Sequence, residues 1–139
     1  MASQPHPQML TSSHFEFDPV NRILLRRLQG RITEEALESL HLEGHKYRTA
    51  TKPRAEIVDC SCVTETTISS DGIRQLARQQ PADPDITLVI VSPATAAFGL
   101  GRMFQIVAES TRPSLTVVRT VDEALAALGV RSPHFEPLE

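Results

Sequence analysis

Three strand-helix units follow one another in the second half of the chain, and this repeat constrains the fold more than any other feature of the sequence. The strand Ile86–Val91 is apolar at nearly every position, which is typical of a parallel strand buried on both faces. Consecutive strands joined by helices predict an α/β domain whose parallel strands are covered by helices. The three expected strands are Ala55–Asp59, Ile86–Val91 and Leu115–Arg119, and the helices that follow them are Ser70–Gln80, Ala94–Ser110 and Asp122–Leu128.

A β-hairpin and a helix are predicted ahead of this repeat. Phe15–Phe17 alternates apolar and polar residues, and Asp18–Asn21 has the residue types of a tight turn. Arg22–Leu28 then forms the second strand of the hairpin. A helix begins at Thr33, whose hydroxyl can accept a backbone N–H, and weakens near Gly44. The sheet is therefore expected to be mixed, mostly parallel and five-stranded, with about four helices.

The composition is that of an ordinary globular protein. The 139 residues are 40% hydrophobic and 22% charged, and the formal net charge of −3 gives no overall attraction to nucleic acid or anionic lipid. No run approaches the ~20 apolar residues that insert across a bilayer, and the N-terminus lacks the apolar stretch of a secretion signal. We expect one cytoplasmic domain at residues 14–130, between a disordered tail at 1–13 and a flexible tail at 131–139.

The sequence predicts no metal, no cofactor and no catalytic residue. Cys60 and Cys62 are separated by one residue on an extended segment, which is a poor geometry for a disulfide and indicates a reducing compartment. Cys-x-Cys supplies half of a zinc site at most, and the five histidines show no matching pair spacing. Ser61 and Ser92 lack the flanking glycines of a nucleophile elbow, and no phosphate-binding loop pattern occurs.

The segment Arg48–Arg54 is predicted to be a loop that carries three cations, Arg48, Lys52 and Arg54. A solvated connector and an anion-binding patch are both consistent with this charge pattern. The sequence alone leaves the two alternatives open.

The order of hairpin, helix and repeated strand-helix units, with the turn Ser69-Ser70-Asp71-Gly72 opening a helix, resembles the STAS family of anti-sigma factor antagonists. Phe98–Phe104 and Val117–Arg119, followed by Asp122–Ala124, look more like bacterial STAS-like proteins of undefined function, which are grouped with that fold and more loosely with CRAL-TRIO lipid-binding domains. The likeness covers about residues 15–130. It implies a noncatalytic regulatory or protein-interaction module whose partner is a regulatory kinase or an anti-sigma-like protein. The alternative that it implies is a small-molecule or lipid-binding domain that uses the helix-sheet cleft.

The antagonist family carries the motif Asp-Ser-Ser-Gly, whose first serine is phosphorylated by a partner kinase. With Gly72 on the glycine, the resemblance puts Ser70 at the phosphorylated position, Asp71 at the second serine and Ser69 at the aspartate, so the match is partial. Asp71 would repel an added phosphate, whereas the helix N-terminus would stabilise it. Alternatively, Ser69 or Ser70 is simply a helix cap. The candidates at this turn are phosphorylation of Ser70 and partner binding by Ser69, Asp71 and Gly72.

Gly99 and Gly101 lie inside a predicted helix, where each glycine costs ~1 kcal/mol relative to alanine. They are not a dinucleotide-binding fingerprint, because the third glycine is missing and the pair lies too late for a strand-helix turn. Their presence predicts a close backbone approach. Tight packing of Phe98 and Phe104 on the sheet is one explanation. The other is a partner or homodimer surface, since aromatic, Met and Arg side chains are enriched at interfaces; its residues would be Phe98, Gly99, Arg102 and Met103.

Overall fold

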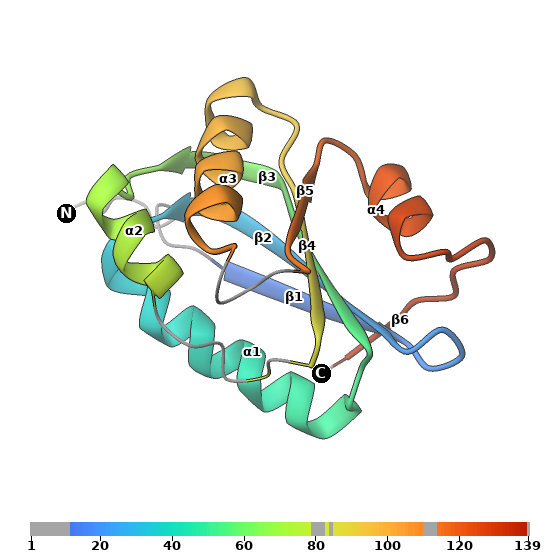
Figure 1. Cartoon of the computed structure of the whole chain (residues 1–139). Helices are drawn as coiled ribbons and strands as arrows, with labels where there is room; N and C mark the ends of the chain where they lie inside the picture. The colour runs from blue at the N-terminus through green and yellow to red at the C-terminus, as the bar shows by residue number, and fades with distance from the viewer. Residues whose placement is uncertain (1–11, 79–82, 84, 110–113, 139) are drawn as a thin grey trace, which may run out of the picture.

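The computed structural model describes residues 12–78, 83, 85–109 and 114–138 (Figure 1). The chain begins with the strands β1 (Ser12–Asp18) and β2 (Ile23–Ile32), a 3-10 turn η2 (Glu34–Ala36) and the helix α1 (Leu37–Thr51). The strand-helix units follow as β3 (Ala55–Thr66), α2 (Ser70–Arg78), β4 (Thr87–Val91), α3 (Thr95–Val107), β5 (Thr116–Val118) and α4 (Val121–Ala127). A short strand, β6 (Glu136–Pro137), is the last element.

All strands belong to one sheet, in the order β5-β4-β3-β2-β1-β6. β2, β3, β4 and β5 are parallel to one another, while β1 is antiparallel to both of its neighbours, β2 and β6. The predicted α/β class and the mixed, mostly parallel sheet are confirmed. The described sheet has six strands rather than the predicted five, because β6 adds to the outer edge of β1.

The helices divide between the two faces of the sheet. Figure 1 shows α1, α2 and α3 on one side of the strands and α4 on the other. β4 illustrates the alternation that this requires, since Val89 and Val91 belong to the core under α4, while Leu88 and Ile90 pack against the core of α2 and α3. The core under α4 also contains buried residues of β2 and β3, which are Ile23, Leu25, Ala55 and Ile57.

α1 is longer than the sequence predicted. It continues through Gly44 to Thr51 and ends at Lys52, which has a left-handed conformation with φ 52°. The predicted loop at Arg48–Arg54 is therefore wrong in its first half. The helix runs on through Gly44, where the missing side chain leaves room for two guanidinium groups: a Cβ there would lie 2.8 Å from Arg26 Nη1 and 2.7 Å from Arg48 Nη1.

The chain after Arg131 is attached to the domain at several points, in contrast to the predicted flexible tail. Phe135 packs against the core under α4, and the Leu138 N–H donates to the Phe15 carbonyl at 2.8 Å. The His134 N–H donates to Asp18 Oδ2 at 2.9 Å, which ties this segment to the turn between β1 and β2. At the other end, Ser12 and Ser13 open β1, and the rest of the predicted N-terminal tail lies outside the described residues.

Asp18 organises the first turn of the sheet. Its fully buried side chain accepts from the N–H groups of Val20 and Asn21 and the Asn21 amide, as well as from His134. Burial by itself would raise the pKa of Asp18, but the hydrogen bonds from Asn21, His134 and Val20 outweigh it and hold the pKa below its ordinary value of 3.8.

We expect Asp18→Ala to lower the free energy of unfolding by about 2–4 kcal/mol, because it leaves several buried donors without their charged acceptor. Denaturant titration of the two proteins measures this loss. Asp18→Asn is the matched control, because it keeps the size and removes the charge. Since the folded-state pKa is depressed, the advantage of wild type over Asp18→Asn is present above the ordinary value of 3.8 and is lost as the pH falls through the lower folded-state pKa. An equal effect at all pH values would contradict this role of the carboxylate.

Candidate functional site

The turn before α2 is capped by Ser69, not by Ser70. Ser69 Oγ accepts from the Gly72 N–H at 3.0 Å, and the Ser69 carbonyl accepts the first helical hydrogen bond from Ile73 at 3.0 Å. Ser70 is exposed at the first position of α2, and within the described part of the chain its hydroxyl has no hydrogen-bond partner. Of the two serines that could cap this helix, Ser69 is the cap, and Ser70 keeps a hydroxyl without a hydrogen-bond partner among the described residues.

Glu34 ties this turn to the start of the first helical segment. Its Oε1 accepts from both the N–H and the hydroxyl of Ser69, each at 2.8 Å. These two hydrogen bonds hold the pKa of the exposed Glu34 below its ordinary value of 4.5. Gly72 is needed for the contact, because a Cβ at this position would lie 2.7 Å from Glu34 Oε1 and 3.0 Å from Ile68 Cγ2. We call the Glu34–Ser69 contact the clasp.

Asp71 is largely exposed to solvent beside Ser70 and pairs with Arg74 of the same helix at 3.0 Å. The structure therefore brings together the four predicted residues of this turn on one exposed rim, and adds Glu34 and Arg74. Neither of these two was predicted. A signal was present for Glu34, which follows a capping threonine, but its partner lies 35 residues further along the chain.

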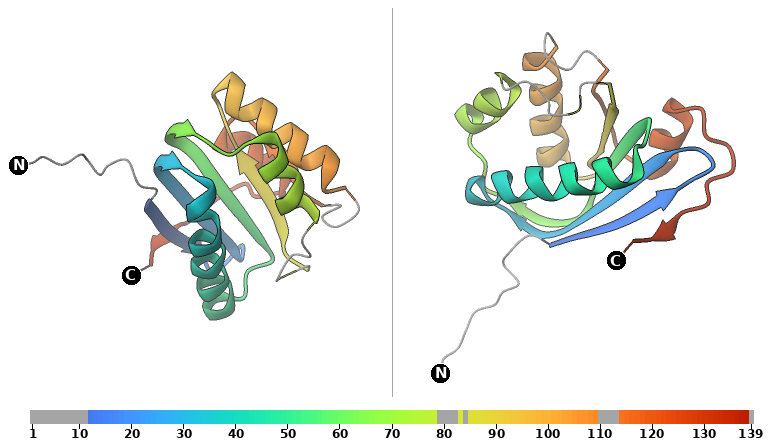
Figure 2. Two further views of the ribbon diagram at one scale, coloured as in Figure 1. Left: turned by 90° about the vertical axis from the view of Figure 1, so that its left-hand side faces the viewer. Right: turned by 90° about the horizontal axis from the view of Figure 1, so that it is seen from below.

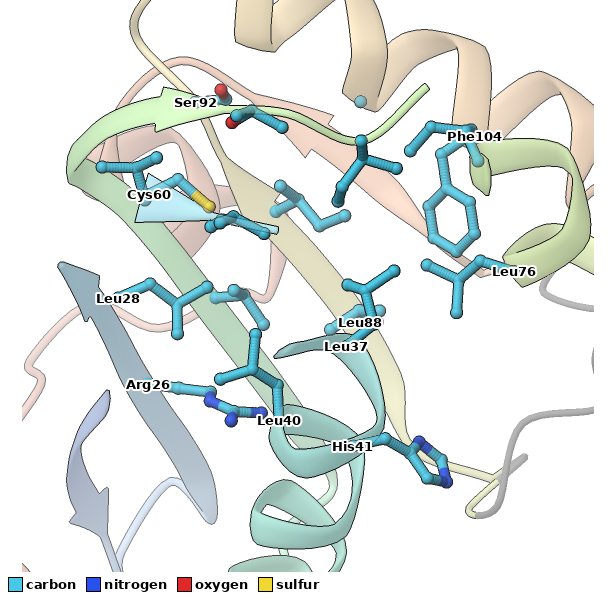
Figure 3. A pocket seen from close by; sticks show the side chains of 18 of the residues that line it. Arg26, Leu28, Leu37, Leu40, His41, Cys60, Leu76, Leu88, Ser92 and Phe104 are labelled. Carbon is cyan, nitrogen blue, oxygen red and sulfur yellow. The ribbon is translucent and has the colours of Figure 1, made fainter. Parts of the chain in front are cut away.

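Behind the clasp lies a cavity of about 280 Å³ between the sheet and the helices α1, α2 and α3 (Figure 3). β2, β3 and β4 form its floor through alternate side chains such as Leu28, Val58 and Ile90. Leu40 of α1, Leu76 of α2 and Phe104 of α3 form its walls. Figure 2 shows α1 set apart from the neighbouring pair of α2 and α3, which is why side chains rather than helix backbones close this space.

Charged side chains line one part of this cavity. Arg48 of α1 donates to Glu56 Oε1 at 2.7 Å and to Asp83 Oδ2 at 2.6 Å, and Arg26 of β2 donates to Glu43 of α1 at 3.0 Å. Glu56 is almost fully buried, and its second oxygen, Oε2, has no hydrogen-bond partner among the described residues. Burial raises the pKa of Glu56 above its ordinary value of 4.5, although Arg48 and Arg26 oppose this.

Ser92 and Cys60 line the opposite part of the cavity. Figure 3 shows Ser92 at the end away from Arg26 and Leu40, with the Cys60 side chain directed into the space between them. Burial raises the pKa of the Cys60 thiol to about 12, with a further contribution from Asp59, so this thiol stays protonated at neutral pH. Cys62, two residues later, is exposed, and both cysteines are free.

The second predicted surface, on α3, is not one continuous apolar patch. The Phe98 ring is covered by the Arg119 guanidinium, whose carbon lies 4.0 Å from the ring centroid, and Met103 packs against the core of α2 and α3. Gly99 and Arg102 are exposed, and Arg102 donates to Gln105 at 2.9 Å. Self-association or partner binding through Phe98, Gly99, Arg102 and Met103 stays a prediction.

The predicted close approach holds for one glycine of the pair. A Cβ at Gly101 would lie 3.0 Å from Val117 Cγ1, so α3 approaches β5 closely at this point, whereas a Cβ at Gly99 would meet nothing within 4 Å. Gly101 also lines the cavity. Packing against the sheet therefore explains Gly101 and leaves Gly99 unexplained.

A search of solved structures finds a similar architecture in an anti-sigma factor antagonist from Mycobacterium paratuberculosis. The TM-score is 0.55 at 20% sequence identity, and the alignment covers 91% of this chain and 99% of that chain. The chain has the anti-sigma factor antagonist fold. The STAS resemblance noted in the sequence is thus confirmed at the level of the fold. No protein-family model matches the sequence, and no curated protein matches it.

The sequence did not predict the ion pairs at the edge of the cavity, whereas a helix-sheet cleft was part of the alternative that the resemblance implied. Glu56 interrupts an apolar strand, and a carboxylate at such a position signals a buried cationic partner. Its partner, Arg48, lay in a segment that the sequence assigned to a loop. Among the residues that the structure describes, no group of three His, Cys, Asp or Glu side chains could hold a metal ion, and no helix is long and apolar enough to cross a membrane.

We expect iodoacetamide at mildly alkaline pH to alkylate Cys62 of the folded protein and to leave Cys60 unmodified, because only the thiolate reacts and burial keeps Cys60 protonated. Peptide mass spectrometry identifies the modified residue. Both cysteines should react in urea, and Cys62→Ser should be inert when folded. Equal alkylation of both cysteines in the folded protein would contradict the raised pKa of the half-buried Cys60 thiol.

We expect Gly99→Ala to raise the free energy of unfolding by up to about 1 kcal/mol, because alanine is the better helix former and the added methyl group meets nothing. Gly101→Ala is the matched variant in the same helix. Its methyl group must displace Val117, so overpacking offsets the gain and the protein should be less stable than Gly99→Ala by about 1–3 kcal/mol. Thermal or denaturant unfolding measures both, and equal stability of the two variants would contradict the close approach of α3.

Proposed function

We propose that this protein is a noncatalytic regulatory module of the STAS type, which acts in the cytoplasm and binds a protein partner at the rim formed by Ser69, Ser70, Asp71 and Gly72. The likeness of its fold to an anti-sigma factor antagonist supports the class of function. The single observation that supports the site is the different environment of the two serines. Ser69 is the helix cap, whereas the Ser70 hydroxyl is exposed and has no hydrogen-bond partner in the described structure. The partner is a regulatory kinase or an anti-sigma-like protein.

The module is switched by phosphorylation of Ser70. The N-terminus of α2 favours an anion, because the first N–H groups of a helix point outward and its dipole is positive there. Asp71 opposes an added phosphate, but its charge is partly neutralised by Arg74 at 3.0 Å. Ser70 can accept the group without losing a hydrogen bond of the folded protein.

A phosphate on Ser70 would act on the clasp. Phosphoserine carries about −1.5 to −2 charges at neutral pH, and it would stand next to Ser69, whose N–H and hydroxyl bind the Glu34 carboxylate. Two anions would then compete for one helix N-terminus. Phosphorylation is therefore expected to release Glu34 and to loosen the junction between η2 and α2, which changes the rim that the partner recognises.

We expect the wild-type protein to gain a single phosphate when it is incubated with ATP and an extract of its host, because Ser70 is the exposed, unengaged hydroxyl of the rim. Intact-mass spectrometry detects the phosphate, and peptide fragmentation locates it. Ser70→Ala should lose it completely. If no phosphate is added under any condition, or if Ser70→Ala retains it, the switch at Ser70 is excluded.

Ser69→Ala is the matched control for this experiment. It removes the cap and should lower the free energy of unfolding by about 1 kcal/mol, while Ser70→Ala should change it by less than about 0.5 kcal/mol. Ser69→Ala keeps the hydroxyl of Ser70 and should still be phosphorylated. The two variants thus separate the structural role of one serine from the proposed regulatory role of its neighbour.

A second candidate function is the binding of a small apolar molecule in the cavity between the sheet and α1, α2 and α3. The cavity volume of about 280 Å³, close to the lower end of typical ligand pockets, favours it. This function is compatible with the first, since the rim and the cavity share a boundary at Ile68 and Leu76 but use different side chains for recognition. Titration of the folded protein with small apolar molecules tests it, with methyl NMR shifts of the lining residues Leu88 and Ile90 as the measure of binding.

A further inference from the structure

A surface groove adjoins the cavity on the side of the rim. Leu37 and His41 of α1 and Leu76 of α2 line both the groove and the cavity, so the two spaces share a wall (Figure 3). Gly72 of the rim lines the groove as well. A single occupant can therefore lie along the groove, touch the rim and reach into the cavity. The remaining residues that line the groove are Glu34, Glu38 and Gln75, all of them exposed.

The groove is acidic. Among the described residues its lining includes the carboxylates of Glu34 and Glu38 and neither a lysine nor an arginine. Glu34 uses Oε1 in the clasp, whereas the carboxylate of Glu38 has no hydrogen-bond or ion-pair partner in the described part of the chain. Interfaces place opposite charges against each other, so the groove complements a partner surface that carries cations.

The two arginines that line the cavity do not reverse this balance. Arg26 pairs with Glu43, and Arg48 pairs with both Glu56 and Asp83. Two cations are thus matched by three carboxylates, so this part of the cavity adds no net positive charge. A cationic partner in the groove is not repelled from behind.

The interior of the cavity complements an apolar side chain. The cavity is open to solvent, and its lining is mostly aliphatic, with the ring of Phe104 on one wall. Leu88 and Ile90 of β4 line its floor. A leucine or phenylalanine of a partner that enters this space removes apolar surface from water on both sides of the contact, which stabilises the complex.

The elements that build the groove favour a helix as its occupant. All of its lining residues belong to η2, α1 and α2, so the described groove offers no strand edge with which an extended peptide could pair. An amphipathic helix recognises such a groove through side chains. Its apolar residues form one narrow stripe, and cations can stand on both sides of that stripe.

We propose that the protein partner contributes a basic amphipathic helix, which lies in the groove between α1 and α2, places its cations beside Glu34 and Glu38, and inserts an apolar side chain into the cavity. This inference rests on the proposed binding of a protein partner at the rim and names the chemistry of that partner. It does not require phosphorylation of Ser70.

Three designed helical peptides of equal length test the proposal. The basic peptide has a stripe of leucine and phenylalanine flanked by lysines. One control replaces every lysine by glutamate, and the other keeps the lysines and replaces the stripe by alanine. Methyl NMR of the folded wild-type protein reports insertion at Leu88 and Ile90, which line the cavity, and Val89 and Val91 of the same strand, which face α4, are the internal control.

We expect the basic amphipathic peptide alone to shift Leu88 and Ile90. It should bind at least about tenfold more tightly than either control, because one control loses the charge complementarity and the other loses the apolar burial. Its affinity should also fall as the salt concentration rises, since exposed charges are screened.

Two charge reversals locate the bound peptide. Glu38→Lys changes the groove, whereas Glu35→Lys makes the same change of charge at an exposed residue outside its lining. Glu38→Lys should weaken binding of the basic peptide by about threefold or more relative to Glu35→Lys. Equal effects of the two variants would show attraction to the overall negative charge of the protein and would overturn the proposal.

The other outcomes are equally decisive. Shifts at Leu37 and Leu76 without shifts at Leu88 and Ile90 would overturn insertion into the cavity. Shifts of Leu88 and Ile90 by benzene, with none by any peptide, would overturn the inference in favour of the second candidate function. Absence of peptide binding leaves the switch at Ser70 standing, since that is measured separately by mass. Because the peptides are compared on the wild-type protein, a variant that fails to fold does not prevent a decision.

Discussion

The ion pair between Arg48 of α1 and Glu56 of β3, at 2.7 Å, fixes where the longest helix lies over the sheet. It does not act alone, because Arg26 of β2 reaches Glu43 on the same helix and Gly44 leaves room for both guanidinium groups. Buried pairs of this kind add little net stability, but removing one partner leaves an uncompensated charge at a cost of about 3–5 kcal/mol. α1 is therefore positioned by charge at one end, and this is the constraint that leaves an apolar space beneath the rest of it.

The same arrangement explains why the rim and the cavity lie next to each other. α2 and α3 pack together around Ile73, Ala77 and Phe104, and α1 lies apart from them. The clasp from Glu34 to Ser69 is a direct polar connection between η2, which precedes α1, and the turn that opens α2. Ile68, the residue before the clasp serine, lines the cavity, so the turn and the cavity adjoin along the chain.

Local patterns predicted most of the fold. The continuous apolar strand Ile86–Val91, the turn residues at Asp18–Asn21 and the cap at Thr33 all depend on neighbours in the sequence, and the class, the parallel strands and the hairpin followed from them. What could not be predicted depends on distant partners. Arg48 lies in the last turns of α1 and donates to Glu56 and Asp83, which come later in the chain, outside this helix. β6 pairs with the open edge of β1, more than 100 residues earlier in the chain. At the candidate site, sequence identified the turn, but the hydrogen bonds from Ser69 to Glu34 join residues 35 positions apart, which local patterns do not reveal.

The hydrogen bond from His134 to Asp18 has a consequence for the order of folding. Its two residues are 116 positions apart, so the carboxylate that shapes the first hairpin lacks one of its donors until the whole strand-helix repeat has been synthesised. Closing so long a loop is slow compared with forming a helix or hairpin. The first turn of the described sheet is consequently among the last to be completed.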